Sequence, residues 1–165
     1  KSLSRRIHHC KHRIWLATPY FIPSLRFRRA LLHAVRRGVD VRILLPGAKG
    51  HDHPAVRIAA HRHYGHLLYF GVKIFEYQPS FMHAKVGLFD DDWTLIGSAN
   101  LDRLSFFVNH EFLLESRSQE LAMETAQQFE TDFSKSIQIP LHEWRKRSLF
   151  HQMLEKFFGL FDRIL

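Results

Sequence analysis

His83 and Lys85 stand two residues apart in a segment, Phe81–Asn100, whose pattern otherwise predicts a β-hairpin. Side chains at positions i and i+2 of a strand lie on one face, so we expect this pair to reach a single ligand. Imidazole exchanges protons near neutral pH and a lysine ammonium binds anions, which together suit chemistry on a charged substrate. Ser98 and Asn100 share a face in the same way on the returning strand.

The spacing H-x-K-x4-D, which runs from His83 to Asp90, arises by chance in roughly three per cent of chains with this composition. The chain has only two asparagines, and one of them ends the sequence Gly97–Asn100 opposite the histidine and the lysine. The alternative is structural, because a sheet histidine, an edge lysine and a turn aspartate are each common. The combination favours a functional motif.

The composition limits the class of protein and its partners. With 165 residues, 45% of them hydrophobic, the chain is long enough for one well-packed domain. A formal charge of +8 favours anionic partners such as nucleic acid, acidic phospholipid or phosphorylated small molecules. Cys10 is the only cysteine, so a disulfide framework and a cysteine-rich zinc site are excluded, and a reducing compartment is expected. Because the chain begins with Lys1 inside a helix-like stretch, we expect a fragment of a longer protein.

Apolar runs separated by glycine and proline predict an α/β fold. The expected strands are Arg13–Thr18, Val39–Leu45, Val72–Tyr77, the two arms of the hairpin, and His110–Glu115. The expected helices are Ser2–His12, Leu25–Arg37, Ala55–Phe70 and Ser118–Ser136. Strands that alternate with helices imply parallel pairing, so together with the hairpin they predict a mixed β-sheet flanked by helices on both faces. We divide the chain into a catalytic unit, 1–139, and a tail, 140–165.

The segments "TPYFIPS", "GVDVRILLPG" and "GVKIFEYQPSFMHAKVGLFDDDWTLIGSANLDRLSFFVNHEFLLE" extend the pattern over almost the whole chain. With H-x-K-x4-D and G-S-x-N, they resemble the phospholipase D superfamily, and within it the carboxy-terminal repeat of bacterial cardiolipin synthases of the B type. Members of this family place two such repeats face to face across one active site, whereas this chain contains one motif.

The resemblance implies a role for each site residue. His83 would be one of two catalytic histidines, and Glu111 would orient its ring. Phosphate binding is implied for Lys85, Ser98 and Asn100. Asp90 completes the catalytic motif, although we expect its role to be structural.

The implied chemistry accounts for these residue types. A phosphodiester is anionic and resists attack, so a lysine and polar donors would stabilise charge that builds on its oxygens. One neutral histidine would attack phosphorus to form a phosphohistidine, while its protonated partner gives a proton to the departing alcohol. This chemistry requires no metal ion or other cofactor.

Five further histidines, which could form a metal cluster, lie in or near the third predicted helix: His51, His53, His61, His63 and His66. Histidines at i and i+2 diverge on a helix and no cysteine joins them, so we expect solvated or capping side chains.

Two other groups have a functional and a structural interpretation. Tyr20 and Phe21 follow a strand end, where they could contact an acyl chain or headgroup at the mouth of the site, or anchor the core. The predicted helix Leu25–Arg37 is basic, and its positive side chains could face anionic lipid or simply be solvated. These side chains are Arg26, Arg28, Arg29, Arg36 and Arg37.

Apolar residues recur at helical spacing from Leu149 to Leu165, after the basic cluster Arg145–Arg147. Charged residues interrupt the run too often for a bilayer-spanning helix, so the pattern is typical of an interfacial amphipathic helix. The alternative is a helix docked on another part of the protein. We expect peripheral attachment to the cytoplasmic face of a bacterial inner membrane.

The resemblance thus implies a phosphatidyltransferase that exchanges alcohols at a phosphodiester of an anionic phospholipid similar to phosphatidylglycerol or cardiolipin, rather than of nucleic acid. Its expected partners are the membrane surface and a second phospholipase D-like repeat, in the same protein or in a homodimer. Two alternatives stay open. One is a single-motif nuclease or phospholipase that acts as a homodimer, and the other is a non-catalytic, membrane-binding remnant.

Overall fold

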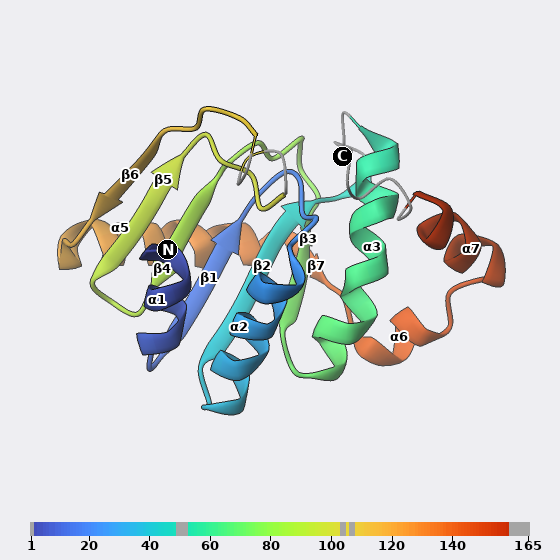
Figure 1. The fold of residues 1–165 in the computed structure, drawn as a ribbon, viewed down its shortest axis with the longest axis horizontal. Helices are drawn as coiled ribbons and strands as arrows, with labels where there is room; N and C mark the ends of the chain where they lie inside the picture. Colours follow the sequence, from blue (N-terminus) through green and yellow to red (C-terminus); the bar gives the residue numbers. More distant parts are fainter. Residues whose placement is uncertain (1, 49–52, 103–104, 106–107, 159–165) are drawn as a thin grey trace.

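One seven-stranded mixed sheet organises the protein, whose computed structural model describes residues 2–48, 53–102, 105 and 108–158 (Figure 1). The strands are β1 (Arg13–Ala17), β2 (Asp40–Pro46), β3 (Lys73–Tyr77), β4 (Val86–Phe89), β5 (Trp93–Gly97), β6 (Leu113–Ser116) and β7 (Ser136–Gln138). The helices are α1 (Ser2–His9), α2 (Leu25–Arg36), α3 (Pro54–Tyr69), α5 (Gln119–Ser134), α6 (Leu141–Arg145) and α7 (Leu149–Phe158). In the order β6-β5-β4-β1-β2-β3-β7, the β1-β2 and β2-β3 pairs are parallel and the others antiparallel.

Each face of the sheet has its own apolar core because side chains alternate along the strands. Ile14 and Leu16 belong to the core that includes residues of α1, α2 and α3, whereas Trp15 and Ala17 belong to the core against α5. The ring of Trp15 meets Phe133 edge-on, with 5.4 Å between centroids. Figure 1 shows α5 behind the sheet and α1, α2 and α3 in front of it. The predicted mixed α/β fold with helices on both faces is confirmed.

Local signals set the ends of the helices. Ser24 accepts a hydrogen bond from the backbone of Phe27 at the start of α2, and Ser118 caps α5 in the same way. Gly38 and Gly71 follow α2 and α3 with φ values of 87° and 95°, a conformation that favours glycine. The helices therefore begin and end close to the predicted positions.

The first arm of the hairpin is shorter than predicted. β4 begins at Val86, so His83 and Lys85 precede the strand instead of lying on it. The carbonyl oxygen of Lys85 still accepts a hydrogen bond from the backbone nitrogen of Gly97, at 3.1 Å. Regular pairing ends there, and the two side chains lie just beyond the edge of the sheet.

The segment just before the predicted tail differs from the prediction. The expected helix 118–136 ends at Ser134, and the chain then forms β7, which pairs antiparallel with β3. The predicted boundary after residue 139 falls between β7 and α6, and α7 packs along α3. The expected amphipathic helix is observed as far as Phe158, while residues 159–165 lie outside the described part. In the ranges described, no helix combines the length and the apolar character needed to cross a bilayer.

Candidate active site

The residues suited to chemistry gather at the carboxyl edge of the parallel strands. Ala17, the last residue of β1, pairs with Val86, the first residue of β4. Val86 opposes Ile96 near the end of β5, and Gly97 pairs with Leu113 at the start of β6. The segments after β1 and β5 and before β4 and β6 therefore meet at one edge, where open α/β sheets bind their ligands.

His83 and Lys85 contact each other at this edge. The imidazole is exposed, and Nζ of Lys85 lies 3.0 Å from its Nε2 and 3.2 Å from its Nδ1. Because an ammonium can only donate, the ring nitrogen that faces it carries a lone pair, which is the form that can attack phosphorus. The rings of Tyr20 and Phe81 lie beside the imidazole, with centroids 6.3 and 5.4 Å away.

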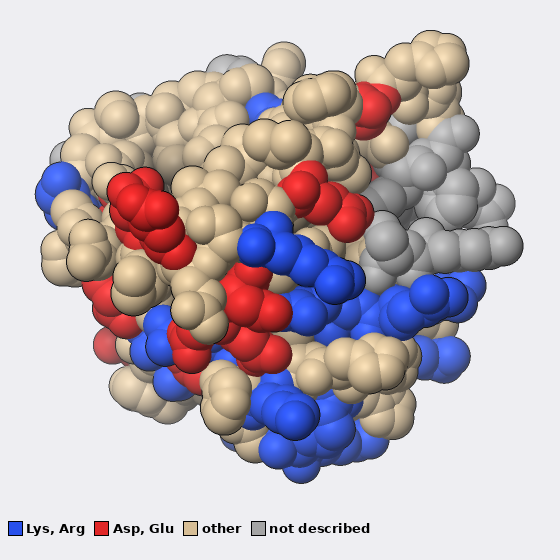
Figure 2. Space-filling view, turned by 90° about the vertical axis from the view of Figure 1, so that its left-hand side faces the viewer, with Lys and Arg blue, Asp and Glu red and all other residues tan. Residues whose placement is uncertain are grey.

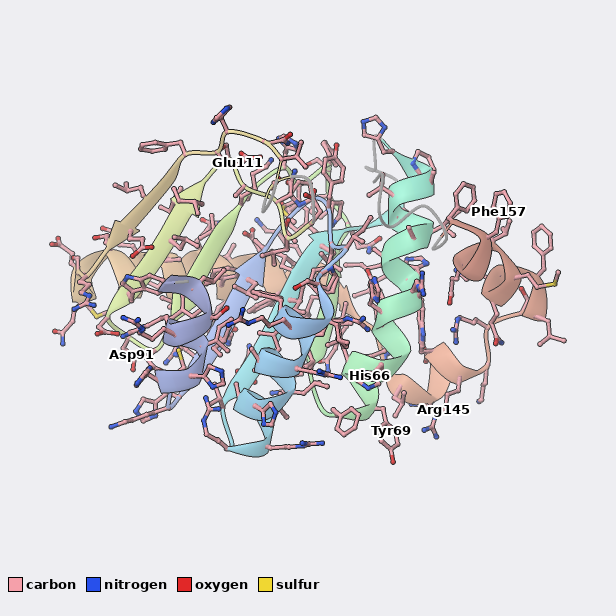
Figure 3. All side chains as sticks on the ribbon, in the orientation of Figure 1. His66, Tyr69, Asp91, Glu111, Arg145 and Phe157 are labelled. Carbon is pink, nitrogen blue, oxygen red and sulfur yellow. The ribbon has the colours of Figure 1, made fainter. Side chains whose placement is uncertain are left out.

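Ser98 and Glu111 form a second pair at the same edge, where Figure 3 shows Glu111. The Ser98 hydroxyl donates to Oε2 of Glu111 and accepts from the backbone nitrogen of Phe112. Asn109 donates to the other carboxylate oxygen at 3.4 Å. The hydrogen bond from Ser98, followed by those from Ser105 and Asn109, lowers the pKa of Glu111. The carboxylate thus bonds Ser98 at the end of β5 and Asn109 beside it, and within the described residues it forms no hydrogen bond to the His83 ring.

Asn100 is held by its backbone, so its side chain remains available. Its backbone nitrogen donates to Oγ of Ser105 at 3.0 Å, and the next residue, Leu101, donates to Oγ1 of Thr18 at 3.3 Å. Oδ1 of Asn100 is buried and forms no hydrogen bond with any described residue. A buried amide oxygen without a partner is costly, which marks a position that a ligand could occupy.

Asp90 lies at the other end of the motif. Its carboxylate accepts from the backbone nitrogens of Lys11, His12 and Arg13, at 2.8–3.2 Å. Asp90 follows Lys85 by five residues along β4, which separates these two residues by about 16 Å. Figure 3 shows Asp91, the next residue, at the end of the sheet opposite Glu111. This geometry agrees with the structural role expected for Asp90 and gives it no contact with the histidine.

Tyr20 and Phe21 separate in function. Tyr20 is half-buried between the rings of His83 and His53, at centroid distances of 6.3 and 5.8 Å. Phe21 is only 1% exposed and belongs to the core. The tyrosine therefore fits the first interpretation, a position at the mouth of the site, and the phenylalanine fits the second, an anchor in the core.

The predicted solvation of the histidine group is wrong for two members. His61 and His63 are buried, and burial lowers the pKa of His63 to about 3. His53 and His66 are exposed as expected, while His51 lies outside the described residues. The alternation of exposed and buried residues shows that α3 is covered on more than one side.

Comparison with known proteins identifies the family. Residues 3–135 match the family described as "Cardiolipin synthase, PLD-like domain". This chain belongs to that family. It is 41% identical over 147 residues to cardiolipin synthase A of Pseudomonas fluorescens, an alignment that covers 89% of this chain and 30% of the relative. The chain thus spans about a third of the length of the curated relatives it matches. These relatives carry the A designation, whereas the sequence resemblance suggested the B type.

Solved structures of the phospholipase D family share the fold. Nuc of Salmonella typhimurium, a phospholipase D family member, superposes with a TM-score of 0.72 at 20% identity, covering 84% of this chain and 89% of Nuc. Phosphatidylserine synthase of Haemophilus influenzae gives a TM-score of 0.74 at 14% identity, covering 98% of this chain and 42% of the synthase. At these identities the likeness concerns the fold alone.

Exposed basic side chains lie along α2, on the side that faces α1. Four of the predicted basic residues of α2 and its end are exposed: Arg26, Arg29, Arg36 and Arg37. Arg28 is half-buried, and Arg37 also donates to the backbone oxygen of Ile7 at 2.9 Å. Basic residues of α1 and α2 line an open groove of about 1040 Å³. On the face in Figure 2, Lys and Arg gather on the lower part beside a group of acidic side chains.

Sequence reasoning missed several residues of the site. Ser105 supports Asn100 and Glu111, and Thr18 holds the backbone at Leu101. Phe81 lies against the ring of His83, although its position two residues before this histidine was a usable signal. The contacts of Ser105 and Thr18 depend on which segments the sheet brings together, so no local pattern identified them.

Proposed function

We propose that this chain is the carboxy-terminal catalytic half of a cardiolipin synthase-like phosphatidyltransferase. The observation that carries the proposal is the contact between His83 and Lys85 at the ligand-binding edge of a cardiolipin synthase-family domain. The exposed imidazole presents a lone pair and the adjacent ammonium supplies positive charge, which together suit attack on an anionic phosphodiester.

The first half of the proposed reaction forms a covalent intermediate. A histidine nitrogen attacks phosphorus, the P–N bond forms, and the P–O bond to the departing glycerol breaks. A second, protonated histidine gives its proton to that glycerol oxygen. In the second half, the same histidine takes a proton from the acceptor hydroxyl, whose oxygen attacks phosphorus as the P–N bond breaks. The number of phosphodiester bonds is unchanged, so the exchange needs no external energy source.

The phosphate is assigned to Lys85, Asn100 and Ser98. The ammonium would neutralise the phosphate oxygens, and the Nδ2 donor of the asparagine amide would position them as charge builds. Ser98 has one hydroxyl proton, which Glu111 now accepts, so the serine must turn that proton toward the phosphate. Glu111 would then be free to accept from a ring nitrogen of His83 and hold the other nitrogen toward phosphorus.

The second histidine is proposed to come from another repeat. The chain carries one H-x-K-x4-D motif and aligns with about a third of the length of its curated relatives. The same fold covers nearly all of Nuc but less than half of phosphatidylserine synthase, so it occurs both as almost a whole chain and as part of a longer one. The greater length of the relatives favours a single chain that holds two repeats.

Helix α7 supports a membrane substrate. One side of it packs on α3, whereas Leu149, Phe150, Met153 and Phe157 are 56–78% exposed. Figure 3 shows Phe157 directed away from the body of the protein. Exposed apolar side chains beside basic Arg145 and Lys146 fit the interface of an anionic bilayer. We place the protein peripherally on the cytoplasmic face of a bacterial inner membrane, with phosphatidylglycerol-like lipid as the substrate.

The test compares a protein that holds both repeats with the isolated 165-residue chain on phosphatidylglycerol vesicles. The two-repeat protein should release glycerol and form a doubly acylated product, with an acid-labile phosphohistidine on the way. The isolated chain should be inactive as a monomer, and inorganic phosphate should promote its dimerisation in sedimentation because two Lys85 ammonium groups can approach only around an anion. A strictly monomeric chain with full activity would contradict the two-histidine mechanism.

The same assay separates the alternative functions. Cleavage of DNA or RNA at rates above lipid turnover would indicate the single-motif nuclease. Vesicle binding without any turnover, even when both repeats are present, would indicate the non-catalytic remnant.

A further inference from the structure

A cluster of ligand-type side chains joins α3 to α7, away from the catalytic motif. It contains His61 of α3 and His151 and Glu155 of α7. Nδ1 of His61 lies 3.0 Å from Nε2 of His151, which lies 3.5 Å from Oε1 of Glu155. All three ligand atoms lie within 4.8 Å of one another. His61 and Glu155 are each 3% exposed, and the His151 side chain is 34% exposed.

Glu76 of β3 fixes the orientation of the His61 ring. Nε2 of His61 lies 3.3 Å from Oε1 of Glu76, and a carboxylate can only accept, so the proton is on Nε2. Nδ1 therefore presents its lone pair to the cluster. A carboxylate behind a histidine ring is the arrangement that commonly supports metal-binding histidines in proteins.

Glu155 is likewise held in place. Arg147 donates from Nε to Oε1 at 2.7 Å and from Nη2 to Oε2 at 2.9 Å, a two-point contact that fixes the carboxylate plane. Each carboxylate oxygen has more than one lone pair, so Oε1 can accept from the arginine and still bind a cation. The buried carboxylate thus faces the two imidazoles in a preorganised position.

From this geometry we infer that His61, His151 and Glu155 form a divalent metal site, of the zinc class, that fastens α7 to α3. Zinc binds imidazole nitrogen and carboxylate oxygen at about 2.0–2.2 Å in a tetrahedral arrangement, which places neighbouring ligand atoms about 3.3 Å apart. Two of the three observed separations, 3.0 and 3.5 Å, bracket that value, and the third, between His61 and Glu155, is within 4.8 Å. Two imidazoles disfavour calcium and magnesium, which prefer oxygen ligands. Water would complete the fourth position, reached from the exposed side of His151.

The site would control the helix that we assign to the membrane. In the absence of metal, the contact between the two histidines is a single hydrogen bond from Nε2 of His151 to Nδ1 of His61. When a metal binds, the proton on Nε2 of His151 moves to Nδ1 of the same ring. Nδ1 of His61 and Nε2 of His151 then each form a coordinate bond to the metal in place of the hydrogen bond. The inference does not depend on the proposed activity, because the cluster shares no residue with the catalytic motif.

Metal binding by the purified protein tests the inference directly. After treatment with a chelator, the protein is titrated with Zn²⁺ against a chromophoric competitor, and with Co²⁺ to record its visible spectrum. We expect one tight equivalent, with a Kd below about 1 µM, and an intense tetrahedral Co²⁺ spectrum. Zn²⁺ should also raise the melting temperature.

Two variants separate the site from the many surface histidines. His151→Gln keeps an amide that can donate to His61 but is a poor zinc ligand, so it should fold normally and bind Zn²⁺ about 100-fold more weakly. The matched control is His66→Ala, which removes an exposed histidine of the same helix, α3, and should bind as the wild type does. A wild-type protein without a tight equivalent, or tight binding that survives His151→Gln, would overturn the inference.

Discussion

The two ends of the H-x-K-x4-D motif have opposite environments although β4 joins them directly. At one end, His83 is exposed and its ring nitrogens meet only Lys85 among the described residues. At the other end, Asp90 receives hydrogen bonds from three consecutive backbone nitrogens of the segment between α1 and β1. The first end is free to meet a ligand, and the second is saturated by its own chain.

This difference shows that one short pattern can combine two requirements. A histidine and a lysine that serve chemistry must remain accessible, whereas an aspartate that fixes the neighbouring loop must not. Changes at the two ends should therefore separate cleanly, with activity lost at one end and stability lost at the other.

The largest effect is expected from His83→Ala in a protein that holds both repeats. Loss of the nucleophile or acid should reduce phosphatidyl transfer by about 10⁴-fold. The side chain is exposed, so the melting temperature should stay within about 1 °C of the wild type. Glycerol release and thermal unfolding measure the two quantities. Retention of most activity would remove His83 from the mechanism.

Lys85→Arg should cost about 10² to 10³-fold in turnover while keeping the charge. The planar guanidinium cannot occupy the position of a compact ammonium 3.0 Å from the imidazole. Steady-state kinetics on vesicles, with Lys11→Arg as a surface control, would detect the loss. Near-normal turnover would place Lys85 outside the phosphate site.

Asp90→Ala should reverse the pattern by lowering the free energy of unfolding by about 2–4 kcal/mol. The change leaves three backbone nitrogens without their charged acceptor and puts alanine at a φ of 53°. Asp91→Ala is the matched control, since Asp91 is exposed and forms a surface ion pair with Arg13. Denaturant unfolding gives the energies. If Asp90→Ala instead abolished activity of the folded protein at unchanged stability, the comparison would fail.

Only a small effect on stability is expected from Glu111→Gln, and it should depend on pH. The hydrogen bond from Ser98 lowers the pKa of Glu111 in the folded protein, so its contribution to stability is present above the unfolded value of about 4.3. It is lost as the pH falls through the folded pKa. The wild type should therefore melt slightly above the variant at pH 7, and the difference should shrink below about pH 4. A difference that grew on acidification would contradict the assignment.

Much of the fold follows from local sequence. Runs such as Val39–Leu45 identify buried strands, Ser24 and Ser118 begin helices, and Gly38 and Gly71 end them. The spacing of His83 and Lys85 also placed them together correctly, although they lie beyond the strand. Strand periodicity cannot reveal where hydrogen-bonded pairing stops, which is why the start of β4 was placed too early.

The features that escaped prediction depend on contacts between distant segments. The bond between Ser98 and Glu111 requires the β5-β6 register that opposes Gly97 with Leu113. His61 and His63 are buried because other segments, including the tail, cover α3. The sequence of the helix itself does not indicate that these segments pack on it. β7 is three residues long and is defined by its partner, β3, rather than by its own composition.

The position of β4 beside β1 also has a consequence for how the protein folds. The hydrogen bonds between Asp90 and the segment at Lys11–Arg13 join residues 77 to 79 positions apart, with β2 and β3 in the intervening chain. Contacts of such long sequence separation form only after a large loss of chain entropy, so they slow folding. The catalytic edge, which needs β1 and β4 side by side, is thus completed late. Because β4 must be synthesised before it can pair with β1, a partly made chain can hold β1, β2 and β3 without this edge of the sheet.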